Sequence, residues 1–141
     1  MKHYISKSQN QTMKIAMDFA KKLKGGDVVV LNGEMGAGKT AFAKGAAKGL
    51  GILQLITSPT FTLVNTYKGK YNLHHFDMYR IQNLNEALAA GILDCFNKDS
   101  ICIIEWPEKI EEILPKRYLK VDIEIISENE RGIDIYENFG D

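Results

Sequence analysis

The sequence has neither a long hydrophobic run nor an excess of charge of one sign. Its apolar stretches fall well short of the roughly 18 residues that a membrane span needs, and its N-terminus shows no signal-peptide pattern. With 18 basic and 18 acidic residues among 141, the formal net charge is zero, so the basic surface with which a protein holds nucleic acid unaided is missing. We therefore expect a soluble, cytoplasmic protein without a membrane partner, which would reach RNA only through another protein.

Cysteine is scarce as well. Cys95 and Cys102 are seven positions apart, which matches neither the C-x-x-C pattern nor the spacing of a zinc site. Both flank or lie within an apolar stretch. We expect buried free thiols, as in proteins of a reducing cytoplasm.

Arginine is rarer than the overall charge suggests, since Arg80, Arg117 and Arg131 are the only three in the chain. An enzyme that transfers a phosphoryl group from a nucleotide to a second substrate usually surrounds the phosphates with several arginines, because it must hold more negative charge. Three scattered arginines argue against a nucleotide kinase.

The clearest feature that is present is a glycine-rich loop. Residues Gly33 to Thr40 fit the phosphate-binding pattern G-x-x-x-x-G-K-[ST], and they lie between a β-branched run at 27–31 and an Ala/Lys-rich helical stretch at 41–50. In such a loop, backbone N–H groups and the helix N-terminus bind phosphate. Lys39 would reach the outer phosphates, and the Thr40 hydroxyl would bind Mg²⁺.

The rest of the chain reads as alternating helices and strands. Helical spacing of Met13, Ala16, Met17, Ala20 and Leu23 predicts an amphipathic core helix that is ended by Gly25 and Gly26. Further elements are predicted as a hairpin over 61–67 and 71–77, a helix over 83–90, a buried strand over 101–104, a short helix over 108–113, and strands over 118–126 and 133–136. These elements indicate one α/β domain with a mixed sheet.

Two carboxylates are candidates for the second half of a nucleotide site. Hydrolysis or transfer needs an acid that organises Mg²⁺ or the attacking group, normally at the C-terminal end of a strand near the loop. Glu105 ends the apolar run 101–104, and Asp77 ends the strand that begins at Tyr71. Glu105 could equally be a solvated strand end, and Asp77 a cap.

The histidines offer little by comparison. His3 is close to the N-terminus, and no second histidine pair or cysteine lies at metal-ligand spacing. His74 and His75 would face opposite sides of a strand. We interpret both as structural.

Adenine is a better match than guanine for the base. The segment Asn97-Lys98-Asp99-Ser100 resembles the guanine-binding pattern N-K-x-D, but its aspartate comes one position early and the segment precedes a strand. No D-x-x-G switch occurs in the chain. These departures favour ATP over GTP.

Four segments in the same order resemble one known family. They are Gly33 to Thr40, Ser58-Pro59-Thr60-Phe61-Thr62-Leu63-Val64 with Tyr67, His75-Phe76-Asp77-Met78-Tyr79-Arg80, and Ile104-Glu105-Trp106-Pro107. Together they closely resemble the TsaE (YjeE) family of small bacterial ATPases that are needed to make threonylcarbamoyladenosine in tRNA. The resemblance implies a P-loop NTPase three-layer fold with a mixed, mostly parallel central sheet and β-hairpins, and a single ATPase domain over 1–141. It also implies ATP and Mg²⁺ as cofactors, TsaB-like and TsaD-like partner proteins, and contact with tRNA only through that complex.

The same resemblance implies roles for individual residues. The catalytic residues would be Lys39, Asp77 and Glu105, with Thr40 and Glu105 as Mg²⁺ ligands. Nucleotide contacts would come from Glu34, Met35, Gly36, Ala37, Gly38, Lys39 and Thr40, with Asn10 and Arg131 bordering the nucleotide. Switch or partner contacts would come from Ser58, Pro59, Thr60, Phe61, Tyr79, Arg80 and Trp106.

Two other functions stay open at this point. A small-molecule or nucleoside kinase would phosphorylate an acceptor instead of releasing free phosphate. A nucleotide-gated binding module would hydrolyse ATP only incidentally. The rate of phosphate release with and without partner proteins would separate both from an assembly ATPase.

Overall fold

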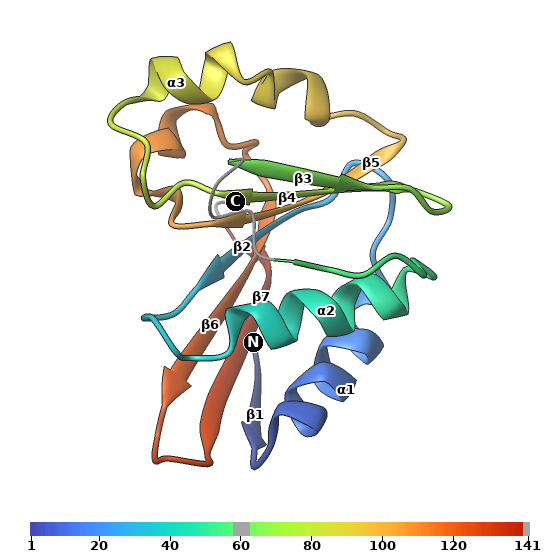
Figure 1. The fold of residues 1–141 in the computed structure, drawn as a ribbon, viewed down its shortest axis with the longest axis vertical. Coiled ribbons are helices and arrows are strands. Elements are labelled where there is room, and N and C mark those ends of the chain that lie inside the picture. Colours follow the sequence, from blue (N-terminus) through green and yellow to red (C-terminus); the bar gives the residue numbers. More distant parts are fainter. Residues whose placement is uncertain (58–62, 140–141) are drawn as a thin grey trace.

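A mixed seven-stranded sheet forms the centre of the computed structural model, which describes residues 1–57 and 63–139 (Figure 1). The strands are β1 (Lys2–Ser6), β2 (Val28–Asn32), β3 (Val64–Tyr67), β4 (Asn72–Asp77), β5 (Ser100–Glu105), β6 (Tyr118–Ile125) and β7 (Arg131–Phe139). The helices are α1 (Gln9–Ala20), α2 (Lys39–Gly49) and α3 (Leu84–Ala89), with 3₁₀ helices η1 (Ile92–Cys95) and η2 (Pro107–Ile113). In these two ranges no helix has the length and apolar character to cross a membrane.

The strand order is β1-β7-β6-β2-β5-β4-β3. The four central strands β6, β2, β5 and β4 run parallel to one another, whereas β7, β1 and β3 join antiparallel at the edges. This arrangement confirms the predicted α/β fold with a mixed sheet that is mostly parallel at its centre. It also confirms the predicted hairpin, which is β3 paired with β4.

Helices cover both faces of the sheet and make three layers. Along β5, Ile101 and Ile103 belong to the core that the sheet shares with α1 and α2, while Cys102 and Ile104 belong to the core shared with α3, η1 and η2. Figure 1 shows α1 and α2 together on one side and α3 on the opposite side. A strand buried on both faces needs the unbroken apolar run that β5 has.

Close contact between α1 and α2 depends on glycine. A Cβ atom added at Gly45 would lie 2.2 Å from the carbonyl oxygen of Met13, and one added at Gly49 would lie 2.4 Å from that of Met17. Neither space can hold a carbon atom. The two glycines therefore let the helix that follows the loop lie directly against α1, and Met13 and Met17 are half-buried there.

The first helix is shorter than the spacing predicts. α1 ends at Ala20, and Leu23 follows in a turn whose backbone N–H donates to the Ala20 carbonyl. The Asp27 carboxylate accepts from the Lys24 N–H at 2.8 Å, which stabilises a non-helical connection to β2. The predicted end at Gly25 and Gly26 was therefore wrong, because this local turn competes with the helix.

Other local predictions are confirmed with small differences. The helix predicted over 83–90 is α3, and its N-cap is Asn83, whose side chain accepts from the Glu86 N–H at 3.2 Å. The helix expected over 108–113 is the 3₁₀ helix η2, and η1 was not predicted. The edge strand β1, which contains Tyr4 and pairs with β7, was not predicted either.

Candidate functional site

The loop between β2 and α2 has the backbone geometry of an anion-binding turn. Gly36 and Gly38 have φ angles of +83° and +104°, a conformation that residues with a Cβ rarely adopt. Gly38 is also the N-cap of α2, which begins at Lys39 without a side-chain cap. The first N–H groups of a helix have no partner within the helix and carry partial positive charge, so this end of α2 can bind phosphate.

The side chain of Lys39 is buried at the centre of the site. Its Nζ lies 3.8 Å from Oε1 of Glu105 and 4.0 Å from the centroid of the Trp106 ring, and the residue is 8% exposed. Burial lowers the pKa of Lys39, and the nearby charges of Glu105 and Asp77 oppose this change. The loop lysine is thus held between a carboxylate and an aromatic face.

Asp77 and Glu105 reach the site from adjacent parallel strands. They are register partners at the ends of β4 and β5. Successive side chains alternate along a strand, so both lie on the same face as Leu73 and Ile103, which pack in the core beneath α1 and α2. Burial, and next the Glu105 charge, raise the pKa of Asp77, although the Tyr79 N–H donates to its Oδ1 at 3.0 Å.

Trp106 follows Glu105 in a left-handed conformation with φ of +56°. This bend turns the chain from β5 into η2, and the indole ring lies 5.0 Å from the ring of Tyr79, centroid to centroid. Tyr79 is 50% exposed, and Arg80 is also exposed. The remaining predicted switch residues, Ser58, Pro59, Thr60 and Phe61, lie outside the described residues.

Two adjoining pockets share the loop as a wall. The first, of about 330 Å³, is lined by Gln9, Met35, Gly36, Gly38, Lys39, Thr40, Ala41, Asp77, Glu105 and Trp106. The second, of about 390 Å³, is lined by Lys7, Ser8, Gln9, Thr12, Gly36, Ala37, Gly38, Ala41, Glu128, Asn129 and Arg131. The first pocket brings together the loop lysine, the loop threonine and both predicted carboxylates.

Arg131, the first residue of β7, contacts the backbone of the loop. Its Nε donates to the Ala37 carbonyl at 3.2 Å, and one of its terminal nitrogens donates to the Gly36 carbonyl at 3.3 Å. Asn10 is exposed in the first turn of α1 and lines neither pocket, whereas its neighbour Gln9 lines both. Arg131 thus lies at the loop and Asn10 does not line these pockets, and the nucleotide contact of each residue stays a prediction.

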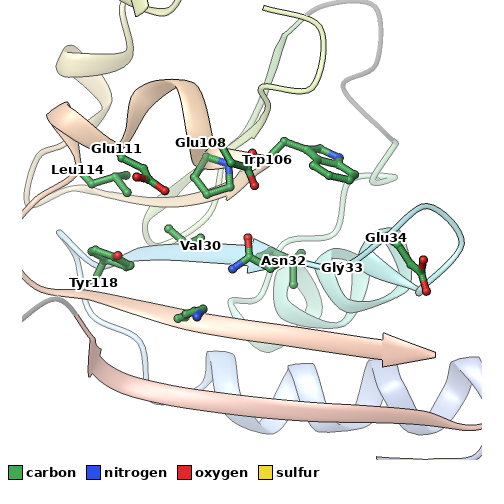
Figure 2. Close-up of a pocket in the computed structure, with 12 residues that line it drawn as sticks. Val30, Asn32, Gly33, Glu34, Trp106, Glu108, Glu111, Leu114 and Tyr118 are labelled. Carbon is green, nitrogen blue, oxygen red and sulfur yellow. The ribbon is translucent and has the colours of Figure 1, made fainter. Parts of the chain in front are cut away.

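A third, larger groove lies next to the loop. It has a volume of about 460 Å³, and its lining residues are Val30, Leu31, Asn32, Gly33, Glu34, Trp106, Pro107, Glu108, Glu111, Leu114, Tyr118 and Lys120. Figure 2 shows Glu108 and Glu111 along one wall of the groove, above β2, with Trp106 and Tyr118 toward its two ends. Because Trp106 also lines the 330 Å³ pocket, this side chain separates the two spaces.

Comparison with known proteins identifies the family. The family model described as "Threonylcarbamoyl adenosine biosynthesis protein TsaE" matches residues 6–133. The chain belongs to the TsaE family. The resemblance that the four sequence segments indicated is thereby confirmed.

Individual TsaE proteins are similar over nearly the whole chain. The tRNA threonylcarbamoyladenosine biosynthesis protein TsaE of Treponema pallidum is 37% identical over 131 residues, which cover 93% of this chain and 97% of the relative. The TsaE protein of Bacillus subtilis is 42% identical over 124 residues, 87% of this chain and 77% of the relative. The crystal structure of Bacillus subtilis YdiB superposes with a TM-score of 0.80 at 35% identity, covering 97% of this chain and 85% of that one.

The sequence analysis did not predict that His75 belongs to the site of this TsaE-family chain. The His75 ring is 1% exposed, and its Nε2 lies 2.6 Å from Oε2 of Glu105. His75 precedes Asp77 by two positions on the same strand, so strand alternation alone places both on one face. The missing information was the strand order, because only the pairing of β4 with β5 brings His75 to Glu105.

The donor groups of this TsaE-family pocket fit a magnesium ion that is shared with a nucleotide. Thr40, Asp77 and Glu105 line one pocket and offer oxygen atoms, which Mg²⁺ prefers. Within residues 1–57 and 63–139 no group of three or more His, Cys, Asp or Glu side chains is arranged to hold a metal. Such a sparse set suits Mg²⁺, which usually binds one or two carboxylates, with water and substrate phosphates as its other ligands.

Proposed function

We propose that this protein is a Mg²⁺-dependent ATPase that supports threonylcarbamoyladenosine modification of tRNA as an accessory subunit of a complex with TsaB-like and TsaD-like proteins. Membership of the TsaE family supports the role in threonylcarbamoyladenosine biosynthesis. One observation carries the ATPase activity: Lys39, Thr40, Asp77 and Glu105 line the same pocket at the N-terminus of α2.

Positioning and charge neutralisation would account for most of the catalysis. The first N–H groups of α2 and the Lys39 ammonium bind the phosphates, whose negative charge spreads over the oxygens during transfer. Thr40 and Glu105 would hold Mg²⁺, which would neutralise further phosphate charge. Asp77 orients the attacking water or supports the metal site from the adjacent strand.

The distribution of arginine supports water, rather than a second substrate, as the acceptor. None of Arg80, Arg117 and Arg131 lines the pocket that contains Lys39. Arg131 lines the neighbouring pocket, and its guanidinium donates to carbonyls of the loop itself. A kinase lid would instead direct several guanidinium groups toward the phosphates.

The charge of the chain supports an indirect role at tRNA. With a net charge of zero, the chain has no overall excess of positive charge that would neutralise the phosphates of an RNA. The partner proteins would therefore bind the tRNA, and the ATPase cycle would act on the complex. This role places the protein in the cytoplasm.

The decisive experiment measures release of free phosphate from ATP and Mg²⁺ by the purified protein alone, with the TsaB-like and TsaD-like proteins, and with tRNA added. We expect a slow rate for the protein alone and a strong increase with both partners. Transfer of labelled phosphate to an acceptor would show a kinase instead. Modification of tRNA at the full rate with a non-hydrolysable ATP analogue would show a nucleotide-gated binding module.

A further inference from the structure

We propose that His75 is a positioning residue that sets the orientation of the Glu105 carboxylate and thereby strengthens Mg²⁺-dependent nucleotide binding. This inference rests on the proposed role of Glu105 as a metal ligand. It assigns a function to a histidine that the sequence marked only as structural.

The contact between the two side chains is short and buried. His75 Nε2 lies 2.6 Å from Glu105 Oε2, and the exposed fractions of the two residues are 1% and 5%. An ionised carboxylate only accepts hydrogen bonds, so the geometry assigns the proton to Nε2. A charge-assisted hydrogen bond of this kind is among the stronger ones in a protein interior.

The two nitrogens of the His75 ring differ in their contacts. Nδ1 is buried and has no hydrogen-bond partner among the described residues. Buried polar atoms nearly always have a partner, so this position of the ring leaves one nitrogen unsatisfied while the other contacts Glu105. Within the described residues the ring is thus held at Nε2 by Glu105.

The two oxygens of Glu105 consequently have different partners. Oε2 is bound by His75, and Oε1 lies 3.8 Å from Nζ of Lys39 at the loop. A glutamate side chain has three rotatable bonds, and a bond to one oxygen restricts the direction of the other. His75 thus leaves Oε1 directed toward the loop, on the side where Thr40 lines the same pocket.

The neighbouring histidine provides a matched control. His74 faces the other side of β4, where its ring nitrogens lie 2.9 Å from Oγ1 of Thr66 and 3.1 Å from Oγ of Ser100. Its substitution changes a partly buried histidine of the same strand without a contact to Glu105. Any effect that is specific to the site must be seen at His75 and not at His74.

Three substitutions of His75 test whether a hydrogen-bond donor is needed at the position of Nε2. The amide nitrogen of His75→Gln can occupy the position near Nε2 and donate to Glu105. The amide nitrogen of His75→Asn lies nearer to the position of Nδ1 and cannot reach. His75→Leu removes the donor altogether, and His74→Gln is the control. Circular dichroism and thermal unfolding identify the variants that are folded, and His75→Asn carries the test should His75→Leu not fold.

The measurement is the affinity for ADP and for a non-hydrolysable ATP analogue, at a series of Mg²⁺ concentrations and in EDTA. Emission from Trp106, the one tryptophan of the chain, can follow the binding because its ring contacts Lys39. Loss of a residue that orients a metal ligand typically weakens metal affinity by about 10- to 100-fold. We expect a loss of this size for His75→Asn and His75→Leu with Mg²⁺, a change within about twofold in EDTA, and near-normal binding for His75→Gln and His74→Gln.

Three results would overturn the inference. They are an unchanged Mg²⁺ response of His75→Asn and His75→Leu, a loss in His75→Gln as large as in His75→Leu, or equal losses with Mg²⁺ and in EDTA. Hydrolysis by the unmodified protein is measured separately. Absence of hydrolysis would contradict the proposed function while leaving the inference about binding intact.

Discussion

Asp77 and Glu105 are register partners at the ends of two adjacent parallel strands, so two acidic side chains lie on one face at the edge of the same pocket. The charge of Glu105 disfavours ionisation of Asp77. The pKa of Asp77 is raised, first by burial and then by the Glu105 charge. A cation between the strands and the loop would relieve this repulsion, as Lys39 does in part.

The repulsion predicts that Asp77→Asn stabilises the protein in EDTA at neutral pH. The folded pKa of Asp77 lies above its ordinary value of 3.8, so the folded state binds more protons than the unfolded state between these two values. Stability therefore falls as the pH rises through this window, and the loss persists at pH 7. Asparagine carries no charge and can still accept from the Tyr79 N–H.

Thermal unfolding in EDTA checks this prediction. The midpoint of Asp77→Asn should exceed that of the unmodified protein at pH 7, and the difference should disappear near pH 3. Asp18→Asn, at an exposed position of α1, is the control. A lower midpoint for Asp77→Asn at pH 7 would show that attraction to Lys39 outweighs burial and repulsion.

Glu105→Ala should lower kcat much more than it lowers the affinity for nucleotide in EDTA. If Glu105 organises Mg²⁺ at the phosphates, its loss removes an interaction that matters most in the transition state, and kcat should fall on the order of 100-fold. The affinity for nucleotide in EDTA should change much less, since the loop and Lys39 remain. Steady-state kinetics and equilibrium binding provide the two numbers. Losses of similar size in both would show that Glu105 maintains the structure of the pocket.

Gly45→Ala should destabilise the contact between α1 and α2. Alanine is the better helix former by about 1 kcal/mol, which alone would stabilise α2. Its Cβ would, however, lie 2.2 Å from the Met13 carbonyl oxygen, and such overpacking costs about 1–3 kcal/mol or more. We expect the packing cost to exceed the gain, with a net loss in the free energy of unfolding measured in urea. Lys48→Ala, at an exposed position of α2, serves as the control.

The two thiols should differ in reactivity from those of an unfolded chain. Burial raises the pKa of Cys102 to about 12, and burial followed by the Asp94 charge raises the pKa of Cys95. At pH 8 only about one Cys102 in ten thousand would be a thiolate, the reactive form. A thiol reagent at pH 8 should therefore modify Cys102 slowly in buffer, and both cysteines quickly in urea. Rapid modification of Cys102 in the folded protein would contradict its burial.

Local sequence rules predicted the parts of the site that depend on neighbouring residues. The loop and the helix that follows it come from residue spacing. The two carboxylates come from the apolar run that stops at Glu105 and from the alternating strand that stops at Asp77. A run of apolar residues does not specify which strand it pairs with. The contact of His75 with Glu105 therefore required the strand order.

Near the two ends of the chain, structure that depends on long-range contacts could not be predicted from the sequence either. β1 is short and pairs with β7, more than a hundred residues away, so its sequence alone does not mark it as a strand. Arg131 was expected beside the nucleotide, but its bonds to the carbonyls of Gly36 and Ala37 follow from the position of β7 in the fold. At Ala20 a competing turn, rather than a glycine, ended the helix.

The most direct test of the proposed ATPase is hydrolysis by Lys39→Ala, compared with Lys44→Ala. Both lysines belong to α2, but Lys44 lines a separate pocket with Leu53 and Leu55, away from the loop. Phosphate release is measured with ATP and Mg²⁺ in the presence of both partner proteins, after thermal unfolding has shown that both variants fold. We expect no nucleotide-dependent turnover by Lys39→Ala and a normal rate for Lys44→Ala. Full turnover by Lys39→Ala would contradict the proposed mechanism.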